Sequence, residues 1–221
     1  PRTMRARPLP RVTSLSAALR MVEPGDIPDA EESHKEGLID VLVDEGKALE
    51  AAREYARKLA KGWSGAGDLA HRFVRNALDE ELIADLTAAM RAADADDSRV
   101  VVLSGKGKTF CAGADIGYMQ RLAEFDHDAN VADAQRLSEA FLAISSCRKP
   151  VVAKVHGAAI GGGVGLVAAC DIVVAAAGTR FGLAEVRLGI LPAVISPFVV
   201  RRLGPATSRY LFLTGERLGA R

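Results

Sequence analysis

Two glycine-rich loops and one isolated carboxylate are the parts of this chain that could do chemistry. The first loop, Gly161 to Gly163, follows an apolar strand-like run and precedes a helical pattern of small residues. Glycine lets backbone N–H groups approach a ligand oxygen with no Cβ in the way, and a helix N-terminus favours negative charge. The second loop, 104–116, also comes after a buried run. The N–H groups of both loops could converge on one oxygen and stabilise an enolate or a tetrahedral oxyanion, although either loop could also be a simple tight turn.

The isolated carboxylate is Glu185, which stands in the largely apolar stretch 181–192. Burial disfavours the charged form of a carboxyl group and raises its pKa, which suits a general acid or base working near neutral pH. The alternative is a surface glutamate paired with Arg187 or Arg180. The glycine run contributes no second acid, because position 165 is glycine.

The elements that must position these residues follow an alternating pattern. Continuous apolar runs predict buried strands, and apolar residues at helical spacing predict helices between them. Glycines at 62, 65 and 67 indicate a linker. The sequence therefore predicts an α/β fold with largely parallel strands. The expected strands are 100–103, 151–155 and 172–174. Helices are expected at 48–60 and at 205–213, the second ended by Gly215. Two more helices are expected between the strands: one is capped by Asn76 or Asp79 and carries Leu82, Ile83, Leu86 and Met90, and the other carries Ala134, Leu137, Phe141 and Ile144.

Composition narrows the class of protein. A net charge of +1 over 221 residues gives no reason to expect nucleic acid or a membrane surface as partner. Three cysteines without a CxxC pair indicate a reducing compartment. No apolar run reaches the roughly 18 residues of a membrane span, and no signal peptide is visible, so we expect a cytoplasmic protein. Asp115 and Asp171 are expected to cap loops rather than bind a metal, because no cluster of ligands surrounds either one.

Three stretches resemble the enoyl-CoA hydratase/isomerase (crotonase) family: FCAGADI at 110–116, KPVVAKVHGAAIGGGVGLVAACDIVVAA at 149–176 and FGLAEVRLGILPAVISPFVVRRLG at 181–204. The resemblance covers roughly Val74 to the C-terminus. It implies a crotonase-like spiral of ββα units with flanking helices, assembled as a homotrimer or hexamer. It also implies that the N–H groups of Ala114 and Gly162 hold the thioester oxygen of an acyl-CoA, and that Glu185 is the family's second catalytic glutamate. Coenzyme A is then part of the substrate, contacted by Ala112, Asp115, Ile116 and Gly161, and no separate cofactor is expected.

The sequence departs from the family pattern at Gly165, where hydratases with a glutamate pair carry the first glutamate. A single carboxylate is enough for a double-bond shift, so chemistry alone favours a Δ3-Δ2 enoyl-CoA isomerase with Glu185 as its base. The amino-acid sequence of these stretches is most similar to the branch of the family that hydrates 3-methylglutaconyl-CoA and related branched glutaconyl-CoAs, in fatty acid or leucine catabolism. There the substrate's own distal carboxylate could help to position water. We favour the hydratase hypothesis over the isomerase hypothesis. The third hypothesis is a non-catalytic crotonase-like binding protein.

The order of segments is the second departure. Residues 1–32 are rich in proline and arginine and are expected to be irregular. Residues 33–67 resemble a family segment whose normal place is C-terminal to the equivalent of Arg221, so they are read as a displaced segment plus linker. Residues 68–221 are read as a truncated or permuted crotonase-like core. A circular permutation, a fusion from a tandem copy or a misassembled fragment would explain this order, and so would an ordinary helix after a short strand.

Overall fold

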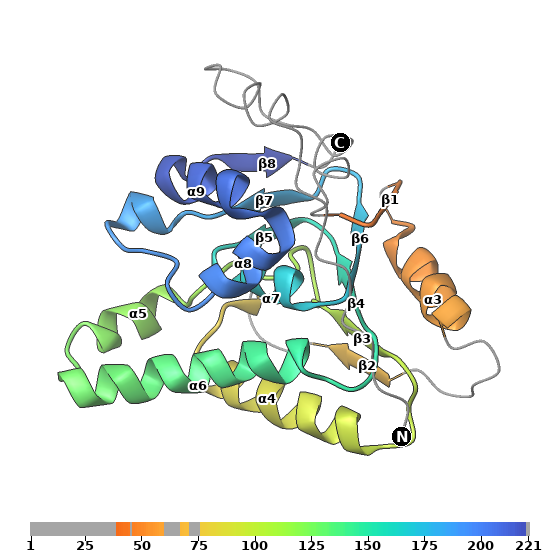
Figure 1. The fold of residues 1–221 in the computed structure, drawn as a ribbon, viewed down its shortest axis with the longest axis horizontal. Helices are drawn as coiled ribbons and strands as arrows, with labels where there is room; N and C mark the ends of the chain where they lie inside the picture. Colours follow the sequence, from red (N-terminus) through yellow and green to blue (C-terminus); the bar gives the residue numbers. More distant parts are fainter. Residues whose placement is uncertain (1–38, 45, 60–66, 71–75, 220–221) are drawn as a thin grey trace.

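The computed structural model describes residues 39–44, 46–59, 67–70 and 76–219. Its main sheet has five parallel strands in the order β1-β6-β4-β3-β2, and a smaller sheet has the order β5-β7-β8 (Figure 1). The strands are β1 Val41–Val43, β2 Gly67–Ala70, β3 Val101–Ser104, β4 Val151–Val155, β5 Ala158–Ile160, β6 Ile172–Ala176, β7 Arg180–Gly182 and β8 Arg217–Gly219. The helices are α3 Ala48–Leu59, α4 Glu80–Ala95, α5 Ile116–Leu122, α6 His127–Ser145, α7 Gly162–Ala169, the 3-10 helix η2 Glu185–Leu188, α8 Ser196–Leu203 and α9 Pro205–Thr214.

The two faces of the main sheet are covered by different helices. Strands β3, β4 and β6 are apolar along almost their whole length and buried on both faces, as is typical of parallel strands. Figure 1 shows α3 on one side of the sheet and α4, α6, α7 and α8 on the other. On the α3 side, Ala52 packs with Val100, Val102, Val152 and Val174. The larger core lies on the opposite side, where the candidate catalytic loops also lie.

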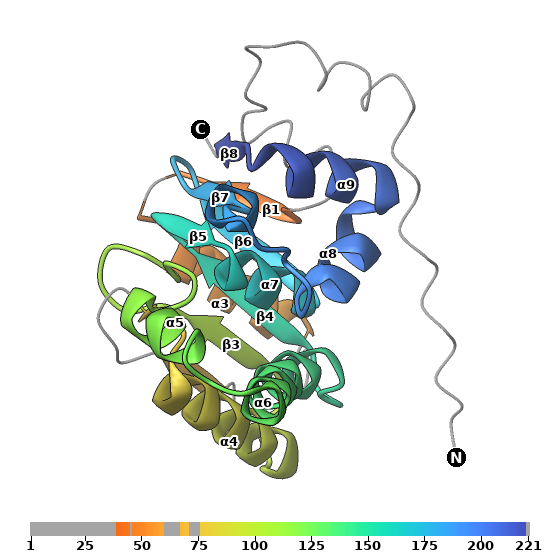
Figure 2. The ribbon, with the colours of Figure 1, turned by 90° about the vertical axis from the view of Figure 1, so that its left-hand side faces the viewer.

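Short strands after β4 and β6 carry the chain from the main sheet into the smaller one (Figure 2). Strand β4 leads into β5 and then α7, and β6 leads into β7 and then η2. Strands β5 and β7 pair in parallel, and β8 is antiparallel to β7. This succession of two strands and a helix confirms the predicted α/β fold of ββα units.

Strand β1 belongs to the main sheet, and helix α3 packs against that sheet. Strand β1 lies at the sheet edge beside β6, with Val41 opposite Val174. The Asp40 carboxylate accepts a hydrogen bond of 2.7 Å from the N–H of Val173 and forms an ion pair with Arg202. The reading of 33–67 as a displaced segment stays a prediction, because residues 33–38, 45 and 60–66 lie outside the described part of the chain. The expected irregular segment 1–32 lies outside it as well.

Most predicted elements are confirmed within a few residues. The structure has helices at Ala48–Leu59 and Pro205–Thr214, the second ended by Gly215 in the left-handed conformation. The strand expected at 100–103 runs from Val101 to Ser104. Asp79, the second of the two alternatives, caps α4 by accepting from the N–H of Leu82 at 2.8 Å. The sequence did not indicate α5, α8 or the strands of the smaller sheet, because each is short and depends on tertiary packing.

Asn76 instead ties the start of α4 to the loop after β3. It is fully buried with a φ of +48°, which asparagine tolerates better than most residues. Its side-chain amide donates to the carbonyl oxygens of Lys106 (3.0 Å), Thr109 (2.6 Å) and Phe110 (2.9 Å). One side chain thus bonds to three positions of the loop that leads to the candidate site.

We expect Asn76→Asp to lower the free energy of unfolding by about 3 kcal/mol or more, because a carboxylate would then face three carbonyl oxygens with no hydrogen to donate. Urea unfolding measures the change. Asn130→Asp is the matched control, because the exposed amide of Asn130 also donates to backbone carbonyls. Equal losses in the two variants would contradict the role of Asn76.

Two absences among the described residues bear on function. None of their helices is both long enough and apolar enough to cross a membrane. Likewise, within the described ranges no group of three or more His, Cys, Asp or Glu side chains is placed to hold a metal ion.

Candidate active site

The glycine junction between β5 and α7 is packed so closely that side chains do not fit there. Gly161 has a φ of +52°, and a Cβ at this position would lie 3.1 Å from Oε1 of Glu185. A Cβ on Gly162 would lie 2.5 Å from Cδ1 of Leu78. A Cβ on Gly163 would lie 2.9 Å from the Cβ and the carbonyl oxygen of Cys111. The three glycines therefore allow a close approach of the two loops and of the carboxylate.

The two glycine-rich loops run side by side in parallel register. Cys111 forms a parallel bridge with Ala159, and the N–H of Ile160 donates to the carbonyl of Cys111 at 3.0 Å. Ala114 follows Cys111 by three residues, and Gly162 follows Ala159 by three. Leu78 touches both positions, through a parallel bridge to Ala114 and through its side chain against Gly162. The structure thus brings together the two backbone positions that the sequence singled out.

The N–H groups of these two residues are available for a ligand. Leu78 forms hydrogen bonds with the two residues on either side of Ala114. Its N–H donates to the carbonyl oxygen of Gly113 at 2.7 Å, and its carbonyl accepts from the N–H of Asp115 at 2.9 Å. In a parallel bridge of this kind, the N–H of the central residue, Ala114, points away from the partner strand. Gly162 is the first residue of α7, and the first N–H groups of a helix have no partner within it. Neither N–H group therefore has a backbone acceptor in its own element. That both bind one ligand oxygen stays a prediction.

Glu185 lies beside this junction and carries the only predicted catalytic side chain. Its Oε1 faces Gly161, and its Oε2 is buried with no hydrogen-bond partner among the described residues. Removal from water raises the pKa of this carboxyl above its ordinary value. The sequence alternative is a surface glutamate paired with Arg187 or Arg180. Among the described residues neither arginine forms an ion pair with Glu185, and the Arg187 guanidinium donates to the carbonyl of Gly215 at 3.0 Å. A half-buried carboxylate with a raised pKa is suited to moving a proton.

The residues expected to contact coenzyme A lie along the same loop. Ala112 is half-buried, and Ile116 is 73% exposed at the start of α5. The side chain of Asp115 caps α5 by accepting from the N–H of Tyr118 at 2.9 Å. Gly161 is buried under Glu185. Their contacts with a ligand stay a prediction.

Gly165 shows what occupies the place of the missing glutamate. A Cβ at Gly165 would lie 2.8 Å from the Cβ of Ile195 and 3.0 Å from Cε1 of Phe141. Both side chains are buried, and Phe141 packs against the ring of Phe198. The sequence did not indicate Ile195, Phe141 or Leu78 as neighbours of the site, because contacts between residues so distant in the chain leave no local pattern.

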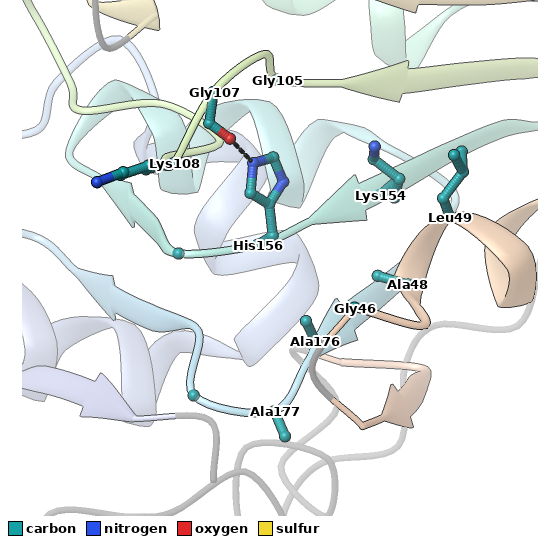
Figure 3. A pocket seen from close by; sticks show the side chains of 12 residues that line it. Gly46, Ala48, Leu49, Gly105, Gly107, Lys108, Lys154, His156, Ala176 and Ala177 are labelled. Atoms are coloured by element: carbon teal, nitrogen blue, oxygen red, sulfur yellow. Dashed lines mark hydrogen bonds between the residues drawn. The ribbon is translucent and has the colours of Figure 1, made fainter.

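A cavity of about 620 Å³ lies on the other side of the main sheet, near the start of α3 (Figure 3). Glycine and alanine line most of it, together with Leu49, Lys108, Lys154 and His156. Figure 3 shows the His156 ring pointing at the carbonyl of Gly107, with Nε2 at 2.9 Å. Neither Glu185 nor Ala114 nor Gly162 lines this cavity, so it is separate from the candidate active site.

The raised pKa of Glu185 predicts a pH dependence of stability. The folded protein holds the proton of this carboxyl more tightly than the unfolded chain, whose pKa is near 4.5. The stability that this proton contributes is fully present below pH 4.5 and is lost as pH rises through the folded-state pKa. We therefore expect the free energy of unfolding of the wild type, relative to Glu185→Gln, to fall as pH rises above 4.5. Denaturant unfolding at a series of pH values tests this; a constant difference, or one that grows with pH, would contradict it.

Comparison with known proteins identifies the family that shares this architecture. The family profile described as enoyl-CoA hydratase/isomerase matches residues 66–221. An enoyl-CoA hydratase of Alternaria alternata is 41% identical over 144 residues, which are 65% of this chain and 46% of that protein. The 2,3-dehydroadipyl-CoA hydratase of Escherichia coli K12 is 36% identical over 148 residues, 66% of this chain and 56% of that protein. The chain spans about half the length of these curated relatives.

Solved structures give the same result. An enoyl-CoA hydratase of Shewanella pealeana matches with a TM-score of 0.69 at 32% identity, and the aligned region covers 76% of this chain and 66% of that chain. Pseudomonas aeruginosa AtuE matches with a TM-score of 0.68 at 36% identity, and the aligned region covers 70% of this chain and 61% of that chain. The fold and the family match define a crotonase-type α/β protein. The chain belongs to the enoyl-CoA hydratase/isomerase family.

Proposed function

We propose that this protein hydrates the α,β double bond of an enoyl-CoA thioester of the branched glutaconyl-CoA type, such as 3-methylglutaconyl-CoA. The N–H groups of Ala114 and Gly162 bind the thioester oxygen and stabilise the enolate that forms as water adds at Cβ. Glu185 transfers the proton between water and Cα. Ala112, Asp115, Ile116 and Gly161 contact coenzyme A.

One observation supports this proposal: Glu185, with a buried and unpaired Oε2, faces Gly161, which directly precedes the proposed donor Gly162. A proton carrier next to an oxyanion site is the arrangement that enolate chemistry needs, because the charge develops on the oxygen while the proton moves at the neighbouring carbon. The hydratases among the related proteins support the reaction class.

The packing around Gly165 favours a second candidate, a Δ3-Δ2 enoyl-CoA isomerase. The place of a second carboxylate is taken by the apolar side chains of Ile195 and Phe141. One base can remove a proton from one carbon and return it to another without a positioned water. Glu185 alone would carry that reaction.

Assembly as a homotrimer or hexamer belongs to the same proposal. Leu188 and Leu191 are 63% and 78% exposed on the segment that follows Glu185. Large apolar side chains gathered on a surface mark contact sites. Light scattering coupled to size-exclusion chromatography measures the mass of the assembly, and a monomer would contradict this part.

A two-substrate assay separates the candidate functions. Purified protein is incubated with 3-methylglutaconyl-CoA and, separately, with a 3-enoyl-CoA, and the absorbance of the conjugated thioester is followed. A hydratase lowers the absorbance with the first substrate, and an isomerase raises it with the second. A folded protein that acts on neither would contradict both enzymatic readings and favour a non-catalytic binding protein.

A further inference from the structure

Helix α5 follows the candidate oxyanion loop directly, and only one of its side chains is buried. It begins at Ile116, two residues after Ala114. Among its seven residues only Tyr118 is buried, at 3% exposure, whereas Ile116 stands in solvent. A short helix with so little buried surface opens locally at low cost unless specific bonds hold it.

Tyr118 makes those bonds with α6. Its hydroxyl donates to the carboxylate of Asp133, which is itself only 5% exposed. Nη2 of Arg136 donates to the same carboxylate oxygen at 2.9 Å. A buried carboxylate with two donors forms strong, directional hydrogen bonds, because little water competes for it. Burial and the neighbouring Asp133 raise the pKa of Tyr118, so the hydroxyl keeps its proton as a donor.

Other contacts of Tyr118 connect this anchor to the oxyanion loop. The N–H of Tyr118 donates to Asp115 Oδ1 at 2.9 Å, and the N–H of Asp115 donates to Leu78 O at 2.9 Å. The Arg121 guanidinium lies 5.7 Å from the centre of the Tyr118 ring and pairs with Glu80 of α4 at 2.9 Å. The backbone on both sides of Ala114 is thus fixed, on one side by Leu78 and on the other by α5.

We propose that the Tyr118–Asp133 pair is the positioning element of the oxyanion site: it holds α5 on α6 and thereby sets the direction of the Ala114 N–H. The inference rests on the proposed function through the role of Ala114. Tyr118 and Asp133 touch no reacting atom and act through Asp115 and the loop before it. An N–H donor must stay within about 0.5 Å of its productive position to stabilise an oxyanion fully.

The test uses Tyr118→Phe, which keeps the ring and removes the donor. Asp133→Asn is the second variant, since it keeps the shape and an acceptor oxygen. Thr87→Val is the control, because it removes another buried hydroxyl, the one that donates to Ile83 O at 2.8 Å within α4. Three quantities are measured: amide hydrogen exchange over residues 113–122, kcat and KM with the enoyl-CoA, and the infrared C=O stretch of the bound thioester.

We expect Tyr118→Phe to raise amide exchange over 113–122 and to lower kcat about tenfold with little change in KM, because a misplaced donor affects the transition state more than the bound substrate. The C=O stretch should move toward its value in water. A merely structural role would change stability and leave the C=O stretch of the folded fraction unaltered, as in Thr87→Val.

Two results would overturn the inference: unchanged exchange over 113–122 in both variants, or a C=O stretch and kcat no more affected than in Thr87→Val. Failure of the wild type to act on any enoyl-CoA would instead count against the proposed function. The exchange measurement then still decides whether the Tyr118–Asp133 pair holds α5 and the loop that contains Ala114.

Discussion

Replacing Glu185 by glutamine is expected to lower kcat by about 10²–10⁴-fold, the usual contribution of a positioned general acid or base. The amide keeps the shape of the side chain and cannot carry a proton between water and Cα. The loss should appear in kcat rather than in KM, because the proposed oxyanion donors, Ala114 and Gly162, are unchanged in this variant. Steady-state loss of the conjugated thioester absorbance measures it.

Glu139→Gln is the matched control for this variant. Glu139 lies on α6, is largely exposed and pairs with Arg91 at 3.1 Å. It is not among the predicted site residues. It should retain wild-type kcat. Turnover that survives Glu185→Gln at more than a tenth of the wild-type rate would remove Glu185 from the mechanism.

Introducing a glutamate at Gly165 is expected to lower the free energy of unfolding by about 3–5 kcal/mol. The new side chain would collide with Ile195 and Phe141, and its carboxylate would be buried without a partner. The single substitution should therefore damage the fold instead of creating the glutamate pair that the resemblance to hydratases of this family implies. Urea unfolding measures the loss.

A double-mutant cycle with Ile195→Ala isolates the steric part of this effect. Ile195→Ala alone should cost about 2–5 kcal/mol through the cavity that it leaves. In the double variant the glutamate fills part of that space, so the combined loss should be smaller than the sum of the two single losses. Additive losses, or a Gly165→Glu protein as stable as the wild type, would show that Ile195 does not close the site.

The chemical elements of the site could be recognised from the sequence because each has a local signature. Consecutive glycines after a strand indicate a close backbone approach, and one carboxylate in an apolar stretch indicates a group with a shifted pKa. The α/β alternation was equally visible, since continuous apolar runs such as 151–155 are typical of buried parallel strands. The branch of the family and the substrate stay predictions.

Where sequence reasoning left two readings open, long-range packing decided between them. Asp79 rather than Asn76 caps α4: Asp79 directly precedes the helix and accepts from the N–H of Leu82. The side chain of Asn76 instead donates to three carbonyls about thirty residues further along the chain. Arg187 could have paired with Glu185, yet it bonds to Gly215 instead. Neither choice leaves a trace in local spacing.

The amino-acid sequence by itself determined which groups this protein can use: two glycine-rich loops, one carboxylate and no second acid at position 165. Only the tertiary structure decided how they meet. The bridge from Cys111 to Ala159 brings the two glycine-rich loops side by side, Leu78 contacts both Ala114 and Gly162, and Ile195 and Phe141 fill the space beside Gly165. The physical reason is that residue types and periodicity are properties of neighbouring positions, whereas register, close packing and the partners of buried polar groups arise between segments far apart in the chain.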